Sequence, residues 1–319
     1  MSLSVMLSLG QTALELGLMC SLTVLALFLS YSMLNVCDLS TDGCFTLGAA
    51  VGAVVAISGH PILSIFAAML AGVCSGFITA LMQTKMGIDS LLSGIIVNTG
   101  LYSVNIAIMG GSSLLNMNKT TTVFTMVKDA LAGTPLASYS ALIVSLTAVA
   151  LVVVFLNFFL KTRLGYAIRA TGNNPDMVKS SSINPAFTTI VGLCVANSFT
   201  GLAGALLSQS QKSVDINLGQ GMVTMALASL LIGGTLISHG SVLKRAIGVV
   251  LGSFIFRLVY TIALRFNMPA FMLKLVSSVI VVLAIFLPYM KKQWPNIQRR
   301  LTHRRASSGT TTQDQKGGK

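Results

Sequence analysis

A polar block near the middle of a largely apolar chain holds the residues whose types and spacing are most informative. The block 163–184 reads RLGYAIRATGNNPDMVKSSSIN and combines a helix stop with a helix start. Gly172 can take the positive φ angle that ends a helix. Asn174 is a favoured N-cap, Pro175 suits the first helical turn, and Asp176 complements the positive end of a helix. We therefore predict that one helix ends and another begins within this stretch.

The residues of this block favour binding to another protein. The second helix is expected to run from Met177 to Ile183, and Asn184 followed by Pro185 repeats the signal that starts a helix. Two helix starts so close together would make a rigid elbow. An ordinary large loop is the alternative interpretation, but such loops are seldom so strongly punctuated, so we favour a docking surface for a cytoplasmic partner.

Motifs for catalysis are absent from the sequence. There is no GxxxxGK[ST] phosphate-binding loop, no HExxH zinc motif and no GxSxG nucleophile motif. The eight acidic residues form no cluster that would hold Mg²⁺, and the five cysteines include no CxxC pair. The sequence predicts a protein that is not an enzyme and that binds no cofactor or metal itself.

Polar side chains within apolar runs are candidates for lining a polar pathway. These candidates are Asp42, Asn98, Asn105, Asn197 and Arg257. Asn98 and Asn105 are seven residues apart and share nearly one helix face. Hydrogen bonding between neighbouring helices is the alternative role for such amides. A charge as deep as Arg257 needs a partner or a water-filled cavity, and Asp38 or Asp42 is its candidate counter-ion.

The elements that position these residues must lie in a bilayer. Of the 319 residues 54% are hydrophobic and 9% are charged, and the mean hydropathy is +0.82. A soluble domain carries about 25% charged residues. Apolar runs recur at 13–36, 44–58, 62–84, 91–110, 138–160, 187–208, 222–238, 246–265 and 270–290. The predicted fold is an all-α polytopic membrane helix bundle with about eight to ten spans.

One of these spans is expected to be discontinuous. The short run 44–58 follows DLSTDG at 38–43, which is polar and turn-forming. Non-helical backbone at membrane depth survives only where protein or water satisfies it, so this break should face the bundle interior. Gly48-x-x-x-Gly52 and Gly248-x-x-x-Gly252 permit close helix approach, either within one subunit or at a dimer seam.

The net charge of +13 orients the chain in the membrane. Placing 161–186 in the cytoplasm and alternating the spans puts most Lys and Arg residues inside, as the positive-inside rule requires. The membrane domain 1–290 is then followed by a basic, disordered cytoplasmic tail, 291–319, and the N-terminus lies outside. No basic start precedes the first apolar run, so no signal peptide is predicted. Nucleic acid is not an expected partner, because basic and aromatic residues do not interleave.

The polar block also resembles a known family. LGYAIRATGNNPDMVKSSSIN is similar to a segment in permease subunits of ABC importers of the branched-chain amino acid and ribose type. In that family Gly-x-Ala-x-Arg-Ala-x-Gly-x-Asn-Pro precedes a short coupling helix. DLSTDG at 38–43 and SFTGLAG at 198–204 resemble further family blocks in the same order. The DLSTDG start and LKLV near Lys274 look most like the branch grouped with tryptophan or tyrosine uptake.

The resemblance implies a division of labour at a bacterial plasma (inner) membrane. Two permease subunits with a type II-like fold, as a homodimer or a heterodimer, would form the pathway. Two separate ATPase subunits would bind ATP and Mg²⁺, and an extracytoplasmic binding protein would dock on segments 111–137 and 209–220. The implied ATPase-coupling residues are Tyr166, Arg169, Ala170, Gly172, Asn174, Pro175, Asp176, Met177 and Ile183. Arg169 and Asp176 are the candidates for polar contacts, although Arg169 also fits the positive-inside rule alone.

The resulting functional prediction is import of a small solute. An amino acid, aromatic such as tryptophan or tyrosine or else branched-chain, is favoured by the branch of the family and mildly by the 16 methionines. The same machine carrying a sugar or nucleoside is one alternative. An ion-coupled secondary transporter or channel is the other, although that class would favour inverted repeats and intramembrane carboxylates.

Overall fold

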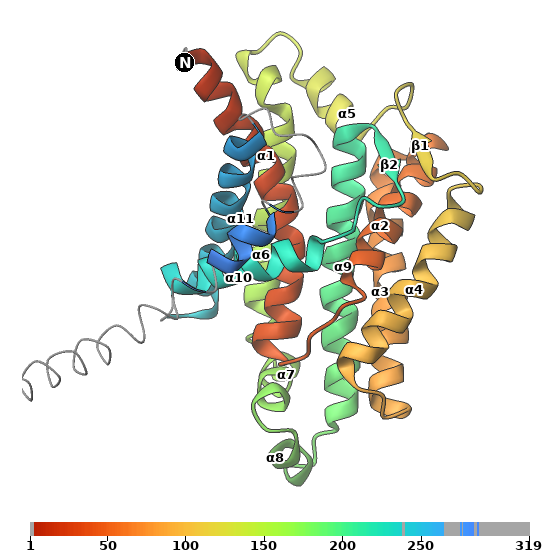
Figure 1. The fold of residues 1–319 in the computed structure, drawn as a ribbon, viewed down its shortest axis with the longest axis vertical. Coiled ribbons are helices and arrows are strands. Elements are labelled where there is room, and N and C mark those ends of the chain that lie inside the picture. Colours follow the sequence, from red (N-terminus) through yellow and green to blue (C-terminus); the bar gives the residue numbers. More distant parts are fainter. Residues whose placement is uncertain (1–2, 238–239, 265–274, 276, 284–285, 287–319) are drawn as a thin grey trace, which may run out of the picture.

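The protein is a bundle of helices in the computed structural model, which describes residues 3–237, 240–264, 275, 277–283 and 286 (Figure 1). The predicted tail 291–319 and most of the apolar run 270–290 lie outside these residues. The elements in chain order are α1 Leu3–Leu27, the π-helix η1 Phe28–Met33, α2 Thr41–Ile57, α3 Pro61–Lys85, α4 Ser90–Ile108, β1 Leu114–Asn116, α5 Val123–Ala130, the 3₁₀-helix η2 Pro135–Tyr139, α6 Ser140–Phe159, α7 Arg163–Asn173, α8 Pro175–Ser180, α9 Pro185–Gln211, β2 Ser213–Asp215, α10 Met222–Leu236 and α11 Val242–Leu264.

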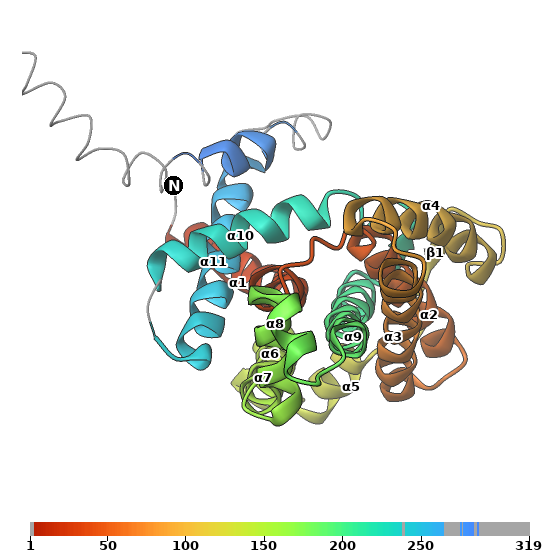
Figure 2. The ribbon, with the colours of Figure 1, turned by 90° about the horizontal axis from the view of Figure 1, so that it is seen from below.

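The long helices confirm the all-α polytopic prediction. Within the described part of the chain, 6 helices are long and apolar enough to cross a membrane: Gly10–Met33, Pro61–Lys85, Ser90–Ile108, Ala137–Phe159, Pro185–Gln211 and Val242–Ala263. Two apolar helices, α2 and α10, are shorter. Figures 1 and 2 show that α10 lies across the long helices, from the side of α4 towards α11. Met222–Leu236, within the predicted run 222–238, therefore forms an element that crosses the bundle sideways.

The predicted discontinuous helix is present at the start of the chain. The π-helix η1 ends α1, and the chain then runs without helix from residue 34 to residue 40 before α2 begins. Asn35 has a φ of 58°, in the left-handed region that an Asn side chain tolerates. Figure 1 shows this segment climbing from the lower end of η1 to the middle of the bundle, where α2 starts.

Helix α9 is the centre of the bundle and packs closely on α2 and α3. It starts at the predicted cap, where Asn184 Oδ1 accepts the Ala186 amide at 3.0 Å and Pro185 occupies the first turn. A side chain on Gly201 would collide with the Ala68 carbonyl oxygen, so the helix backbones touch directly there. Gly48 and Gly52 also face α9, and Gly248 and Gly252 face α10. Both glycine pairs thus serve packing within one subunit.

The strands β1 and β2 and helix α5 lie at the end of the bundle opposite α7 and α8, where they form one connected layer (Figure 1). Strands β1 and β2 pair antiparallel, with Leu115 opposite Val214. Gln209, at the end of α9, accepts the Val123 amide at 2.9 Å and donates to Ser64 Oγ at 2.7 Å. These contacts tie α5 and the loop after α9 together.

Candidate functional site

The break before α2 is held by a buried carboxylate. Asp38, 1% exposed, accepts hydrogen bonds from the Ser40 amide at 2.8 Å and the Ser40 hydroxyl at 2.6 Å. Its other oxygen accepts from Asn197 Nδ2 on α9 at 2.7 Å. Buried polar groups are costly unless they are paired, and these three bonds satisfy the carboxylate where the backbone leaves the helix. The break is therefore fastened to the central helix.

A second carboxylate, Asp42 in the first turn of α2, caps a helix far away in the sequence. Its two oxygens accept the amides of Gly221 at 2.9 Å and Val223 at 2.8 Å, at the start of α10. Gly221 itself offers no side-chain cap. A negative charge at a helix N-terminus satisfies free amides and complements the helix dipole. The starts of α2 and α10 therefore meet at one point inside the bundle.

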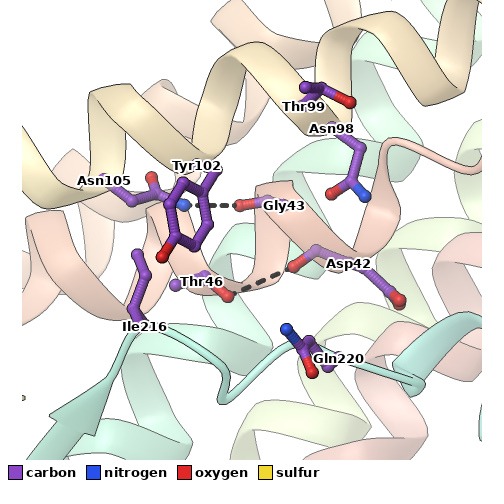
Figure 3. Close-up of a pocket in the computed structure, with 9 residues that line it drawn as sticks. All are labelled: Asp42, Gly43, Thr46, Asn98, Thr99, Tyr102, Asn105, Ile216 and Gln220. Carbon is purple, nitrogen blue, oxygen red and sulfur yellow. Dashed lines mark hydrogen bonds between the residues drawn. The ribbon is translucent and has the colours of Figure 1, made fainter. Parts of the chain in front are cut away.

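A polar cavity of about 260 Å³, which we call the Asp42 cavity, lies beside this point (Figure 3). It is lined by Asp42, Gly43, Thr46, Asn98, Thr99, Tyr102, Asn105, Ile216 and Gln220. Asn105 is 1% exposed and donates to the Gly43 carbonyl at 3.2 Å, while its Oδ1 has no hydrogen-bond partner. The Asp42 cavity thus offers a carboxylate, which is an acceptor for a ligand that donates hydrogen bonds.

The structure brings three of the five predicted pathway residues together. Asp42, Asn98 and Asn105 line the Asp42 cavity, whereas Asn197 lies against Asp38. Arg257 lies on α11 and lines a different cavity of about 740 Å³, between α9, α10 and α11. The counter-ion prediction was wrong, because within the described residues neither Asp38 nor Asp42 forms an ion pair with Arg257.

Six lining residues were not among the predicted pathway residues: Gly43, Thr46, Thr99, Tyr102, Ile216 and Gln220. Thr46 and Tyr102 each lie four positions after a predicted residue, Asp42 and Asn98, so helical spacing alone could have found them. Gln220 comes from the loop before α10 and gives no such signal. No group of three or more His, Cys, Asp or Glu side chains that could hold a metal ion occurs in the part of the chain that the structure describes.

The elbow at the other end of the molecule follows the predicted caps with two corrections. Asn174 Oδ1 accepts the amides of Asp176 and Met177, each at 3.1 Å, and α8 starts at Pro175. The helix ends at Ser180, so the predicted extension to Ile183 was wrong. Gly172 does not end its helix with a positive φ, because α7 continues through it to Asn173.

Gly172 instead allows close packing of the elbow on the first helix. A side chain there would meet the Met33 carbonyl oxygen, and its Cβ would lie 2.8 Å from the Leu34 carbonyl carbon. The neighbouring Thr171 hydroxyl lies 2.8 Å from that of Thr188 on α9, and both side chains are buried. The elbow is thereby attached to the end of η1, where the break begins, and to α9, which holds the break through Asn197.

The outer surface of the elbow is partly apolar. Tyr166 is 59% exposed, Met177 is 61% exposed and Ile183 is 38% exposed. The Arg169 guanidinium stacks 5.7 Å from the centre of the Tyr166 ring, and Lys179 pairs with Asp176 at 3.5 Å. Ala170 and Gly172 are partly buried, so they support the elbow and offer little of its surface. Leu164, 39% exposed, adds an apolar contact that the sequence did not indicate.

A bundle of membrane-length helices with an interrupted helix, a polar internal cavity and an elbow defines the membrane-spanning subunit of a transporter. The chain belongs to the family described as branched-chain amino acid transport system / permease component, which matches residues 12–286. It is thus a permease of ABC import systems, a class that works with ATPase and binding-protein partners. The predicted resemblance is confirmed.

Individual relatives cover most of the chain. It is 32% identical over 275 residues to a tyrosine transport system permease protein of Clostridioides difficile (strain R20291), covering 83% of this chain and 86% of that protein. It is 26% identical over 288 residues to a probable branched-chain amino acid transport permease protein, LivH, of Methanocaldococcus jannaschii, covering 88% and 82%. The ribose import permease protein RbsC of Escherichia coli (strain K12) is 23% identical over 263 residues, covering 80% and 78%. No solved structure matches the chain.

Proposed function

We propose that this permease imports an amino acid, most suitably an aromatic one such as tyrosine, and that a separate ATPase drives it through the elbow. The observation that carries the proposal is the joint between α2 and α10, where Asp42 caps α10 beside a polar cavity. Interrupted helices that meet inside a bundle are a common way to build a transport site. The 32% identity to a tyrosine transport system permease protein supports the class of solute.

The Asp42 cavity suits the ammonium group of an amino acid. Its one charged residue is the Asp42 carboxylate, and the side chains of Thr46 and Gln220 add further acceptor oxygens. An ammonium group carries three donors and no acceptor, so it matches such a lining. The hydroxyl of Tyr102 and the amide of Asn98 complete the polar wall seen in Figure 3.

The pathway is expected to lie between two copies of the permease on the side of α4. The exposed residues of α4 are apolar in its first part, where Leu91, Leu92, Ile95 and Ile96 lie, and include the polar Thr99, Tyr102 and Ser103 in its second part. Lipid-facing surfaces are apolar, so the second part of α4, beside the Asp42 cavity, fits a water-filled passage.

The attachments of the elbow support its role in energy coupling. An ATPase that closes around α8 would push α7, and α7 rests on Met33, Leu34 and Thr188. Those elements carry the break and α9, so the motion would reach the starts of α2 and α10. The proposed orientation has the elbow in the cytoplasm, the N-terminus outside, and β1, β2 and α5 facing the binding protein.

The elbow is tested by co-purification of the ATPase with the full-length permease from native membranes. Met177→Asp is the test variant and Met86→Asp its matched control, because these methionines are 61% and 64% exposed. We expect the amount of ATPase recovered with the Met177 variant to fall at least about tenfold, because the new charge would lose its water in an apolar contact. The amount recovered with the control variant should not change. Equal recovery with both variants would contradict docking on the elbow.

The solute is tested by uptake into liposomes that hold the permease, its ATPase and its binding protein. ATP-dependent uptake of labelled tyrosine that excess ribose does not inhibit is the expected result. Uptake of ribose in place of tyrosine would contradict the proposed solute but not the proposed role of the elbow. Uptake driven by an ion gradient without the ATPase would contradict both parts of the proposal.

A further inference from the structure

Arg257 places a fixed positive charge within a membrane-length helix. It lies about 18 Å along α11 from Arg245, at 1.5 Å per residue. Charged side chains at membrane depth are costly and persist where they face a partner or a water-filled cavity. The structure therefore has to account for what neutralises this guanidinium.

No acidic side chain of the chain performs that task in the part that the structure describes. Glu15, Asp38, Asp42, Asp89, Asp129, Asp176 and Asp215 all lie in that part, and none of them forms an ion pair with Arg257. The guanidinium instead lies 5.1 Å from the centre of the Tyr260 ring, and one of its amino groups lies 3.9 Å from the sulfur of Met225. Its Nε is buried without a hydrogen-bond partner. These contacts orient the guanidinium and leave its charge uncompensated.

The space in front of Arg257 is large enough for a solute. The cavity of about 740 Å³, which we call the Arg257 cavity, is lined by Leu207, Gln211, Leu218, Gln220, Gly221, Met222, Thr224, Met225, Arg257, Tyr260, Ser277 and Ser278. Arg257 is the one ionised residue in this lining. The Asp42 cavity has a carboxylate as its one charged residue, and Gln220 lines both cavities. Two spaces of opposite charge thus border the start of α10.

We propose that Arg257 binds the carboxylate of the transported solute in the Arg257 cavity. A planar guanidinium presents donors that match the two oxygens of a carboxylate, and a partly dehydrated setting strengthens such a bond. Thr224 and Ser278 supply hydroxyl groups in the same lining. The inference rests on the proposed amino-acid substrate and extends it, because the Arg257 cavity offers a partner for the carboxylate of an amino acid as the Asp42 cavity offers one for its ammonium group.

The first experiment measures ligand-induced stabilisation of the purified full-length permease in detergent. The probe is 3-(4-hydroxyphenyl)propionate, which carries a carboxylate and no amine. Tyramine, which carries the amine alone, and inorganic phosphate are tested beside it. A ligand that binds the folded state raises the melting temperature. We expect the propionate to raise it in the wild type and in Arg257→Lys, but not in Arg257→Met, and we expect phosphate to have no effect.

Arg245→Met is the matched control, because it removes an arginine from the same helix. Arg245 lies 5.4 Å from the centre of the Phe28 ring and does not line the Arg257 cavity. This variant should keep the response to the propionate. An equal response in Arg257→Met and the wild type would overturn the assignment. A response to phosphate that Arg257→Met abolishes would identify a phosphate-binding site instead and would also overturn it.

The second experiment separates this inference from the proposed function. In liposomes that contain the whole importer, Arg257→Met should lower tyrosine uptake at low substrate at least tenfold. Tyrosine uptake that is equal in Arg257→Met and the wild type would refute the role of Arg257 and leave the solute class standing. A wild type that carries ribose and no tyrosine would refute the proposed solute. Loss of the second permease copy from the Arg257→Met complex would show that Arg257 pairs across the dimer and would overturn the inference.

Discussion

Asp38 is predicted to be the polar residue on which the interrupted helix depends most. Replacing it with Ala removes three hydrogen bonds, two from Ser40 and one from Asn197. Bonds to a charged group are worth about 1.5–3 kcal/mol each, but removing one partner of a buried pair also lets its neighbours rearrange. We expect Asp38→Ala to lower the free energy of unfolding by about 3–5 kcal/mol.

The isosteric variant Asp38→Asn serves as the control for this prediction. It keeps one acceptor oxygen for Ser40 and places an NH₂ group opposite the NH₂ group of Asn197. The Asn197 side chain can turn its oxygen towards the new NH₂ group, which restores part of the contact. We expect a loss of about 1–2 kcal/mol. A double-mutant cycle between Asp38→Ala and Asn197→Ala should give a coupling energy of about 2 kcal/mol.

The assay measures the free energy of reversible unfolding in bicelles by steric trapping. Neutral hydrogen bonds between membrane helices average about 0.6 kcal/mol, so the coupling energy discriminates between two roles. A coupling energy at or below that value, with equal losses for Asp38→Ala and Asp38→Asn, would refute the conclusion that a buried carboxylate fastens the break.

Three further predictions concern contacts elsewhere in the bundle. Asp42→Ala removes the cap of α10 and should cost about 1–2 kcal/mol of unfolding free energy. Gly201→Ala should destabilise the protein by about 1–3 kcal/mol because the new methyl group meets the Ala68 backbone. The control Gly100→Ala, in open space on α4, should stabilise the protein by about 0.8 kcal/mol. Melting temperatures of the two variants that shift in the same direction would contradict the described packing of Gly201. Gln209→Leu removes the acceptor of the Val123 amide, whose hydrogen exchange should accelerate about tenfold for each 1.4 kcal/mol lost; unchanged exchange would show that Gln209 does not hold α5.

The elements that follow local rules could be predicted from the sequence. Asn174 with Pro175, and Asn184 with Pro185, start helices because a cap acts within one turn. The turn-forming residues of DLSTDG indicated a break, although the break lies at 34–40, and Thr41, Asp42 and Gly43 belong to α2. The cavity residues Asn98 and Asn105 share a face because helical spacing is regular.

The parts that depend on distant partners could not be predicted. Gly172 carries a helix-ending residue type, yet packing against Leu34 keeps it within α7. Asn197 pairs with Asp38, and Arg257 pairs with neither candidate carboxylate, because these contacts depend on how α2, α9 and α11 are placed. Tertiary placement of this kind leaves no trace in residue spacing.

The bond between Asp38 and Asn197 also has a consequence for biogenesis. The two residues are 159 positions apart, so the ribosome makes the acceptor long before its donor. At about 5–20 residues per second, Asp38 waits roughly 8–30 s before Asn197 is synthesised. During that interval the carboxylate has only its two bonds from Ser40, and the break has no attachment to the central helix. Charged groups are costly in lipid, so we expect the break to become stable only after α9 has been made, which places this step late in the assembly of the permease.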